Sequence, residues 1–320
     1  LPAHLFELKR VVQATRTLWS PQRDTGDLRP PLPPPDTHSH WRVHSYTGVA
    51  RRIVDAEDAA APQTFTPGFG DDELESEPAS TTRFNRFTFP KGPRAGVALH
   101  TLLENLDFSR TMADQSEHIS RCLARIGLTR NVEQWHKVLS DWMSDVTATS
   151  LATDVRLGDV IRSRRLDEME FHFPLSTDAG MLNLLKSQGY LGAGATLDIK
   201  VLQGMMTGLI DLVFESRGRY FLVDYKSNFL GANFEDYRTV HLENAIRHHH
   251  YDLQYLIYCV ALRRYLMSRL PDFDYATQFG GVYYLFLRGM NGTADGSGVY
   301  FDKPDEAFLD RLDDILGGAA

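Results

Sequence analysis

Residues Gly208–Asn228 read GLIDLVFESRGRYFLVDYKSN, and this stretch predicts the centre of the fold. Two apolar runs, Leu209–Phe214 and Tyr220–Tyr225, flank a short polar break that contains Gly218. Both runs are rich in β-branched and aromatic residues and have the length of a strand. The stretch therefore predicts a β-hairpin.

A two-residue turn at Arg217-Gly218 would fix how the two strands pair. Phe214 then faces Phe221, and three residues further from the turn Asp211 lies directly opposite Asp224. Like charges at directly opposed positions of a sheet are destabilising. At an effective dielectric constant of 20, two carboxylates about 4 Å apart repel by roughly 4 kcal/mol. The pairing therefore needs a compensating charge.

A divalent cation between Asp211 and Asp224 would supply that charge. Mg²⁺ suits a carboxylate pair, because it keeps several waters and phosphate oxygens in its coordination shell. Lys226 shares the face of Asp224, since side chains alternate along a strand. Beside a metal, its amine could orient or deprotonate a water, or neutralise charge on a phosphate. The alternative is a surface hairpin in which Lys226 only forms a salt bridge with Asp224.

The composition is that of a globular protein with one sizeable core. Of 320 residues, 42% are hydrophobic and 24% charged, which is ordinary for a soluble domain. The chain begins at Leu1 and shows no signal peptide or long apolar span, so we interpret it as an excised piece of a longer cytoplasmic protein. Only Cys122 and Cys259 are present. Two cysteines suit a reducing compartment and are too few for an iron–sulfur cluster, which needs about four.

The net charge of −8 argues against a free-standing nucleic-acid binder, because such proteins usually carry a basic face. Two considerations weaken this objection. Much of the acid lies in one segment, Asp71–Glu77, which we interpret as a solvated run rather than a metal site. A domain that works in a complex can also depend on partner subunits for its affinity for DNA.

The first 83 residues divide into short segments of different character. Leu1–Ser20 has helical spacing. The proline-rich Arg29–Pro35 predicts an extended linker, with an SH3-like partner as the alternative. Asp55–Ser80 lacks periodicity and predicts a mobile acidic loop. We therefore divide the chain into an N-terminal helix and Pro-rich linker (1–40), a lead-in segment and acidic loop (41–83) and the main domain (84–320).

The main domain alternates helical and strand patterns, which predicts an α/β fold with a mixed central sheet flanked by helices. Besides the hairpin, the predicted strands are Leu166–Pro174 and Gly281–Leu287. The predicted helices are Gly96–Leu106, Met112–Ile126, Val132–Thr147, Gly180–Gly189, Tyr237–His250, Tyr251–Arg269 and Pro304–Leu316.

Several polar residues in these elements have more than one interpretation. His100 lies on an amphipathic helix and could be a core histidine, a surface histidine or a metal ligand. Gln254 and Tyr258 are one helical turn apart and could orient a substrate strand or the lysine, or form only a structural hydrogen bond. His248–His250 points in several directions from a helix, so we predict a basic surface there rather than a metal site. Arg162–Arg165 contains three arginines that could contact phosphate or simply form an exposed face.

The motifs together resemble the PD-(D/E)xK nucleases and, within them, the family of RecB C-terminal nuclease domains. The metal-binding core is represented by Gly208–Asn228. Tyr251–Tyr258 resembles the family's Q-x-x-x-Y helix, and Phe279–Gly289 resembles the strand that follows it. Pro93–Phe108 resembles the helix that carries a histidine metal ligand. The resemblance extends from about Trp41 to the end of the chain.

The resemblance implies a restriction-endonuclease-like fold and a set of site residues. Leu166–Pro174 resembles the strand before the metal hairpin, which carries another acidic site residue. Glu170 is the match, and Glu168, on the same face, is the alternative. The implied set is catalytic Asp211, Asp224, Lys226 and Glu170, metal-binding His100, Asp211, Asp224 and the main-chain carbonyl of Tyr225, and positioning Gln254 and Tyr258.

The resemblance also implies a function: a Mg²⁺-dependent deoxyribonuclease of the exonuclease V type, located in the bacterial cytoplasm. It would hydrolyse phosphodiester bonds with a metal-activated water, within a helicase–nuclease that processes double-strand ends for recombinational repair. Mn²⁺ is a further candidate ion, because imidazole favours softer metals. The implied partners are single-stranded DNA ends, the helicase part of a parent chain, other subunits of a RecBCD-like complex and a recombinase. The alternative is a non-catalytic docking module for a partner subunit or recombinase.

Overall fold

A computed structural model describes residues 42–50, 53–54, 83–152, 155–191, 196–197 and 201–317. The predicted helix Leu1–Ser20, the Pro-rich segment Arg29–Pro35 and the whole predicted loop Asp55–Ser80, with its acidic run Asp71–Glu77, lie outside these residues. The domain limits proposed from the sequence stay predictions.

The predicted hairpin is the centre of a mixed six-stranded sheet. β7 (Val201–Ser216) and β8 (Arg219–Lys226) pair antiparallel, with Phe214 opposite Phe221 as predicted. Arg217 and Gly218 both have positive φ, 52° and 79°, as a type I′ turn requires. The hairpin and its two-residue turn are therefore confirmed.

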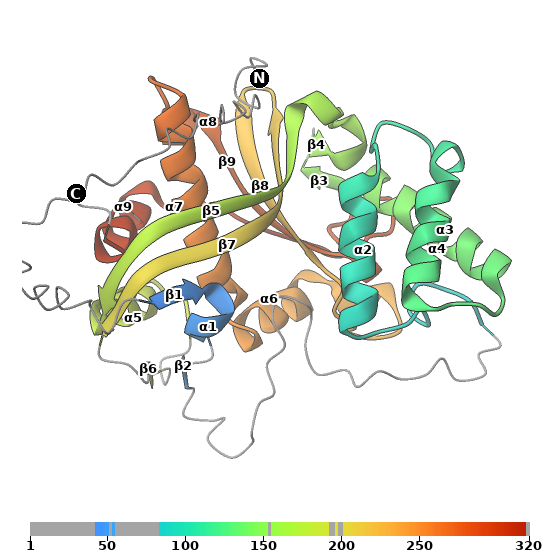
Figure 1. The fold of residues 1–320 in the computed structure, drawn as a ribbon, viewed down its shortest axis with the longest axis horizontal. Helices are drawn as coiled ribbons and strands as arrows, with labels where there is room; N and C mark the ends of the chain where they lie inside the picture. The colour runs from blue at the N-terminus through green and yellow to red at the C-terminus, as the bar shows by residue number, and fades with distance from the viewer. Residues whose placement is uncertain are drawn as a thin grey trace, which may run out of the picture.

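The long strand β7 changes its partner along its length. Its first part pairs in parallel with β1 (Arg42–Ser45) up to Thr207, and its last part pairs with β8 from Leu212 onward. β5 (Arg165–Asp178) follows its other edge throughout. Figure 1 shows β5 and β7 crossing the molecule together, with β1 and β8 at different points along them. Between the two partners, the edge of β7 at residues 208–211 is open to other groups.

The remaining strands complete the sheet and add two small ribbons. β8 pairs in parallel with β9 (Phe279–Phe286), which pairs antiparallel with the edge strand β10 (Val299–Asp302). The small ribbons are β2 (Ile53–Val54) with β6 (Thr196–Leu197), and β3 (Ser150–Ala152) with β4 (Val155–Arg156).

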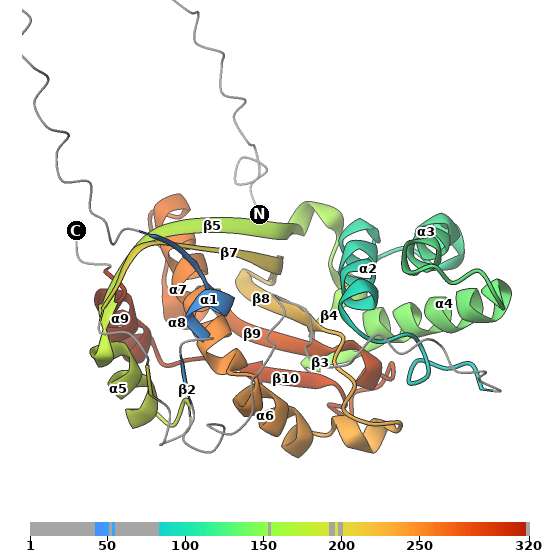
Figure 2. The same ribbon diagram turned by 60° about the horizontal axis from the view of Figure 1, so that its bottom comes forward.

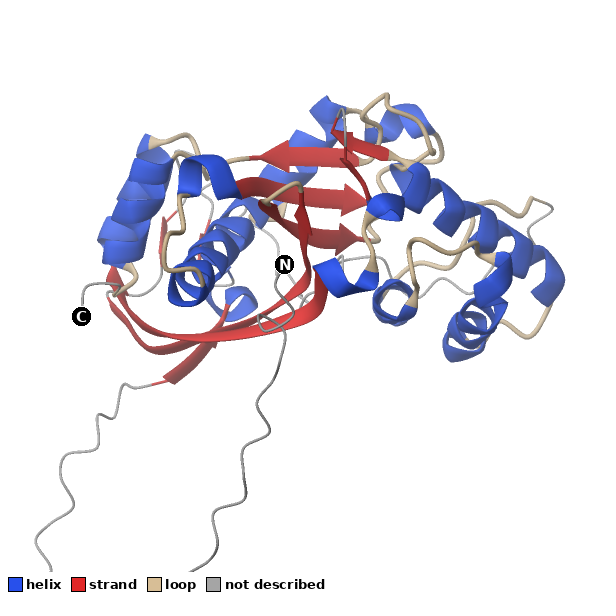
Figure 3. Cartoon of the chain, turned by 90° about the horizontal axis from the view of Figure 1, so that it is seen from above, coloured by secondary structure: helices blue, strands red, loops and turns tan. Residues whose placement is uncertain are grey.

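Helices cover both faces of the sheet, so the predicted mixed α/β fold is confirmed (Figures 2 and 3). One hydrophobic core lies between the sheet and α2, α3 and α4, and the other lies between the sheet and the helices that include α5, α6, α7 and α9. Alternation along β8 supplies both cores, since Leu222 belongs to one and Val223 to the other. The helices are α1 (Tyr46–Ala50), α2 (Pro93–Asn105), α3 (Ser116–Ile126), α4 (Val132–Ala148), α5 (Ala179–Ser187), α6 (Thr239–His248), α7 (Tyr251–Arg269), α8 (Tyr275–Gln278) and α9 (Glu306–Ile315).

A buried arginine connects the approach to α2 with the end of the hairpin. Arg288 follows β9 and is 1% exposed. Its guanidinium donates to the carbonyl oxygens of Ser227 (3.1 Å), Phe89 (3.2 Å), Pro90 (2.8 Å) and Arg86. Hydrogen bonds from a charged donor are among the stronger ones in proteins. Arg288 therefore helps to hold α2 at a fixed position beside the end of β8.

In the part of the chain that the structure describes, none of the helices combines the length and the apolar character needed to span a bilayer.

Candidate active site

Asp211 lies at the point where β7 changes partner. The ladder between β7 and β8 ends at Leu212 and Val223, one residue before the two aspartates. Asp211 Oδ2 accepts a hydrogen bond from the Tyr225 N–H at 2.7 Å, and its Oδ1 is 3.3 Å from His100 Nδ1 on α2. The open edge of β7 thus brings Asp211 into contact with both β8 and α2.

The second carboxylate forms a buried ion pair. Asp224 and Lys226 are 4% and 3% exposed, and Lys226 Nζ is 2.7 Å from Asp224 Oδ2. The same amine donates to Gln254 Oε1 at 3.0 Å, and Gln254 Nε2 donates to the Tyr258 hydroxyl at 3.1 Å. The burial of Asp224 and Lys226 excludes the surface hairpin that the sequence left as an alternative. The two hydrogen bonds show that Gln254 and Tyr258 belong to one hydrogen-bonded chain that reaches the lysine.

Two tyrosines that the sequence did not indicate complete the surroundings of Lys226. Nζ lies 3.8 Å from the ring centre of Tyr251 and 4.9 Å from that of Tyr284, within the range of a cation–π interaction. The Tyr284 hydroxyl also donates to Gln254 Oε1 at 2.9 Å. Every residue of β9 is buried, so its sequence lacks the alternation that would have marked the face of Tyr284.

A cavity of about 280 Å³ opens at the break in the edge of β7. Of the predicted site residues, His100, Asp211, Asp224, Gln254 and Tyr258 line it. Lys226 contacts two of these, Asp224 and Gln254, from within the protein. The other lining residues are Ser45, Tyr46, Val97, Thr101, Glu168, Thr207, Gly208 and Leu209.

The structure places Glu168, rather than Glu170, in this cavity. The flanking pairs of the β5–β7 ladder set Glu168 opposite Asp211, and Glu168 has a positive φ of 49°. Glu170 lies two residues further along the strand. Its side chain is 68% exposed, and its Oε1 is 3.2 Å from His172 Nε2. The placement expected for Glu170 is therefore corrected: both residues share a face of β5, but the cavity reaches only Glu168.

Burial and charge act against each other on the ionisable groups. Burial opposes ionisation of Asp211, but the charge and hydrogen bond of His100, with the Tyr225 N–H, outweigh it and lower the pKa of Asp211. Burial raises the pKa of Asp224 to about 6. The charge of Lys226 lowers this pKa, and the charge of Asp211 raises it further. Burial lowers the pKa of His100, but Asp211 reverses this and the net shift is upward. When protonated, the His100 imidazole thus neutralises a carboxylate that a metal ion could neutralise instead.

The donor set fits a divalent cation. Two carboxylates, a main-chain carbonyl and an imidazole are donors that Mg²⁺ and Mn²⁺ accept. Asp224 Oδ2 is buried and makes no aligned hydrogen bond within the described part of the chain. No three His, Cys, Asp or Glu side chains there surround a common ion position, and His100 Nδ1 lies 3.3 Å from Asp211 Oδ1. By donor chemistry, His100, Asp211, Asp224 and the Tyr225 carbonyl fit a metal.

Two other groups of basic residues do not join this site. Arg165 is buried and donates to the Leu106 carbonyl at 2.6 Å, and Arg164 pairs with Glu215 at 3.3 Å, so both have structural partners. His249 was predicted to lie on a basic surface. It instead stacks on Tyr251, and burial, with the neighbouring His248 and Lys226, lowers its pKa to about 4. The prediction of a basic surface is therefore wrong at His249, which is neutral at pH 7.

Residues 79–318 match the family model of the PD-(D/E)XK nuclease superfamily. The chain belongs to this superfamily. The family predicted from the sequence is thereby confirmed, and membership supports a DNA nuclease. Proteins of the PD-(D/E)XK superfamily generally use divalent metal ions, which agrees with the donor set of the cavity.

Curated relatives place the chain within one branch of the PD-(D/E)XK superfamily. It is 35% identical over 284 residues to the RecBCD enzyme subunit RecB of Escherichia coli, covering 87% of this chain and 23% of the relative. With the RecB subunit of Haemophilus influenzae the identity is 36% over 291 residues, covering 86% and 24%. With that of Mycolicibacterium smegmatis it is 29% over 332 residues, covering 88% and 29%. The chain thus spans about a quarter of the length of these relatives.

Proposed function

We propose that this chain is the nuclease domain of a helicase–nuclease and hydrolyses phosphodiester bonds in DNA with a divalent metal ion. The observation that carries the proposal is the meeting of two charged pairs at one cavity. Asp211 with His100 and Asp224 with Lys226 converge there. The desolvation penalty of a buried ion pair can exceed its Coulombic gain, so a buried lysine and carboxylate next to a second carboxylate support a functional rather than a stabilising role.

The metal that we propose is Mg²⁺, with Mn²⁺ as a second candidate. His100, Asp211 and Asp224, which line the cavity, would hold it together with the main-chain carbonyl of Tyr225, the residue after Asp224. When bound, the ion supplies Lewis-acid polarisation of the scissile phosphate and lowers the pKa of water.

The protein's own groups position the reactants. Lys226, fixed by Gln254 and the two tyrosine rings, directs its charge toward the phosphate and the attacking water. The water oxygen forms the new bond to phosphorus as the water gives up a proton to solvent, the bond to the leaving sugar oxygen breaks, and that oxygen takes up a proton from solvent. Glu168 is the acidic residue that we assign to orienting the water, because it lies opposite Asp211 in the cavity.

The setting that we propose follows from the relatives, whose printed names describe a subunit of the RecBCD enzyme. The chain would work in the bacterial cytoplasm on single-stranded DNA released from double-strand ends. Its partners would be the helicase part of its parent chain, the other subunits of such a complex and a recombinase. A docking module without catalysis is the competing function, and the net charge of −8 favours it.

Cleavage of linear single-stranded DNA in Mg²⁺ tests the proposal. Asp211→Asn should reduce cleavage at least about 100-fold, since it removes one proposed metal ligand. The matched control is Asp272→Asn, because Asp272 is exposed and outside the cavity. If neither the protein nor its reconstituted parent complex cleaved DNA, the docking module would replace the nuclease.

A further inference from the structure

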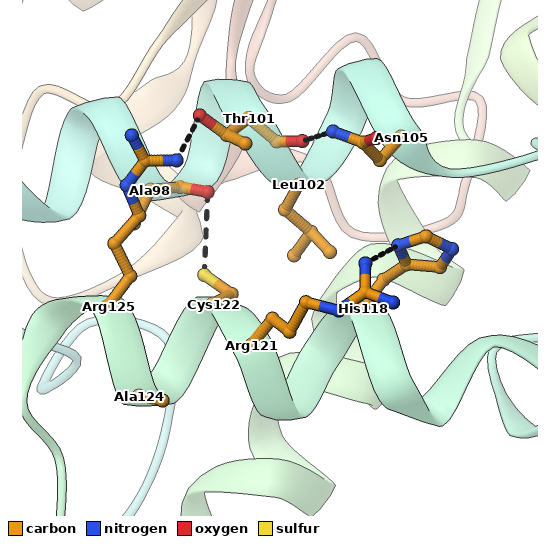
Figure 4. A pocket seen from close by; sticks show the side chains of 9 residues that line it. All are labelled: Ala98, Thr101, Leu102, Asn105, His118, Arg121, Cys122, Ala124 and Arg125. Carbon is orange, nitrogen blue, oxygen red and sulfur yellow. Dashed lines mark hydrogen bonds between the residues drawn. The ribbon is translucent and has the colours of Figure 1, made fainter.

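A second hollow lies between α2 and α3 (Figure 4). Figure 1 shows that α3 lies on the side of α2 that faces away from the sheet. The volume of the hollow is about 430 Å³. The floor is apolar, with Ala98 and Leu102 from α2 and Cys122 from α3. The thiol donates to the Ala98 carbonyl at 3.5 Å, and burial raises its pKa to about 12, so it stays protonated. The floor thus offers a neutral surface against which a flat apolar group can pack.

Two arginines, Arg121 and Arg125, give the rim of this hollow a positive charge, and His118 lines it beside them on α3. None of the lining residues is Asp or Glu, as far as the structure describes the chain. Arg125 Nη1 donates to the Thr101 hydroxyl at 3.0 Å across the two helices (Figure 4). Arg121 pairs with Glu117 at 2.5 Å, but both side chains are mostly exposed, so water competes for this pair. In a chain of net charge −8, such a rim favours an anionic ligand.

The hollow adjoins the candidate active site. Thr101 lines both cavities, and its neighbour His100 lines the first. Helix α2 is therefore a shared wall with the proposed metal ligand on one side and the arginine rim on the other. A polymer with a repeating negative charge could contact both sides of this wall at once.

We propose that the α2–α3 hollow binds a nucleotide of the same DNA strand that occupies the active site. The inference rests on the nuclease function proposed above and adds a second substrate contact to it. The base would pack on the apolar floor, and the neighbouring phosphate would contact Arg121 and Arg125. Single-stranded nucleic acid is bound in this way, by basic groups along the backbone and packing surfaces for bases. The volume is within the range of small-ligand sites.

The test compares Arg121→Gln/Arg125→Gln with a control of equal charge change, Arg110→Gln/Arg130→Gln. Both control residues are exposed and lie outside the hollow. Binding of a fluorescent oligothymidylate is measured without metal over a range of salt concentrations. The hollow variant should bind about 10-fold more weakly, and its slope of log K against log salt should be smaller by about 0.7, since the two arginines contact one phosphate and each phosphate neutralised on a single strand contributes about 0.7. The control variant, Arg110→Gln/Arg130→Gln, should change the affinity and the salt slope less than the hollow variant does.

A small substrate separates this inference from the proposed nuclease function. Thymidine 5′-(p-nitrophenyl phosphate) has one phosphodiester and no neighbouring nucleotide, so the hollow variant should cleave it with Mg²⁺ at the rate of the unaltered protein. Equal losses of binding in the hollow and control variants, or unchanged binding and slope in the hollow variant, would overturn the inference. If the unaltered protein binds the oligonucleotide but cleaves neither substrate, the nuclease function fails and the binding result still decides on the hollow.

Discussion

At the scale of single residues, the site is defined by how completely Lys226 is held. Its amine contacts a carboxylate, an amide oxygen and two aromatic rings. A flexible side chain that is fixed in this way loses little further entropy when substrate binds. The lysine is therefore suited to act on a phosphate at one defined position.

Lys226→Met tests whether this amine serves catalysis rather than the fold. Methionine keeps most of the volume, and a metal ion can compensate the charge of Asp224 that the variant leaves unpaired. Cleavage of single-stranded DNA should fall at least about 100-fold, while Mg²⁺ still raises the unfolding temperature. If the variant lost both cleavage and the Mg²⁺-induced rise in unfolding temperature, Lys226 would instead be needed for the structure of the metal site.

Gln254→Leu tests the positioning role of the glutamine. The variant removes the acceptor of both Lys226 and Tyr284, so the lysine loses part of its orientation. We expect kcat to fall about 10-fold with KM nearly unchanged, because an interaction important mainly in the transition state changes kcat. Steady-state cleavage kinetics measure both constants. A rise in KM alone would show that Gln254 contacts the substrate instead.

The residue scale also shows what the sequence could and could not predict. The pairing of Asp211, Asp224 and Lys226 depends on strand alternation and a two-residue turn, which are local properties. The choice between Glu168 and Glu170 depends on where a cavity ends, and alternation alone places both on one face. Tyr284 could not be identified, because the whole of β9 is buried and shows no pattern.

At the scale of elements, the exchange of β1 for β8 along β7 creates the site. It exposes residues 208–211 between two paired regions and lets α2 approach Asp211. Gly208, at this break, leaves room for the ring of Phe171 on β5, because a Cβ atom there would lie 2.4 Å from that ring. The exchange could not be predicted from the hairpin, since it depends on a strand from the distant lead-in segment.

Arg288→Met tests the connection that holds α2 beside the hairpin. The variant removes hydrogen bonds to four carbonyl groups. Buried carbonyls left without partners are costly, so the free energy of unfolding should fall by about 3 kcal/mol. Urea denaturation measures this. Arg130→Met, at an exposed position, should change it by less than about 0.5 kcal/mol; equal effects of the two variants would contradict the role of Arg288.

At the scale of the whole molecule, two helical layers enclose a sheet that carries the site at an internal break. The helix–sheet order was predictable because the hydrophobic periods of helices and strands differ. The acidic net charge is a property of the whole chain, whereas the cationic rim between α2 and α3 is local. Composition alone therefore does not reveal the local positive charge between α2 and α3.

Metal binding should stabilise the whole fold. A ligand that binds only the native state at 100 times its Kd adds about 2.7 kcal/mol to the free energy of unfolding. Saturating Mg²⁺ should therefore raise the Tm above the value of the same protein in the presence of a chelator. Asp211→Asn should remove most of that rise; an equal rise in this variant would place the metal elsewhere.

The most direct test of the nuclease site is the single-turnover cleavage of linear single-stranded DNA in Mg²⁺ by the Asp224→Asn protein. Asparagine has nearly the same shape as aspartate but lacks the charge proposed to hold the metal beside Lys226. We predict a folded protein that cleaves at least about 100-fold more slowly than the unaltered chain. Cleavage at the unaltered rate would show that the hairpin is not the active site.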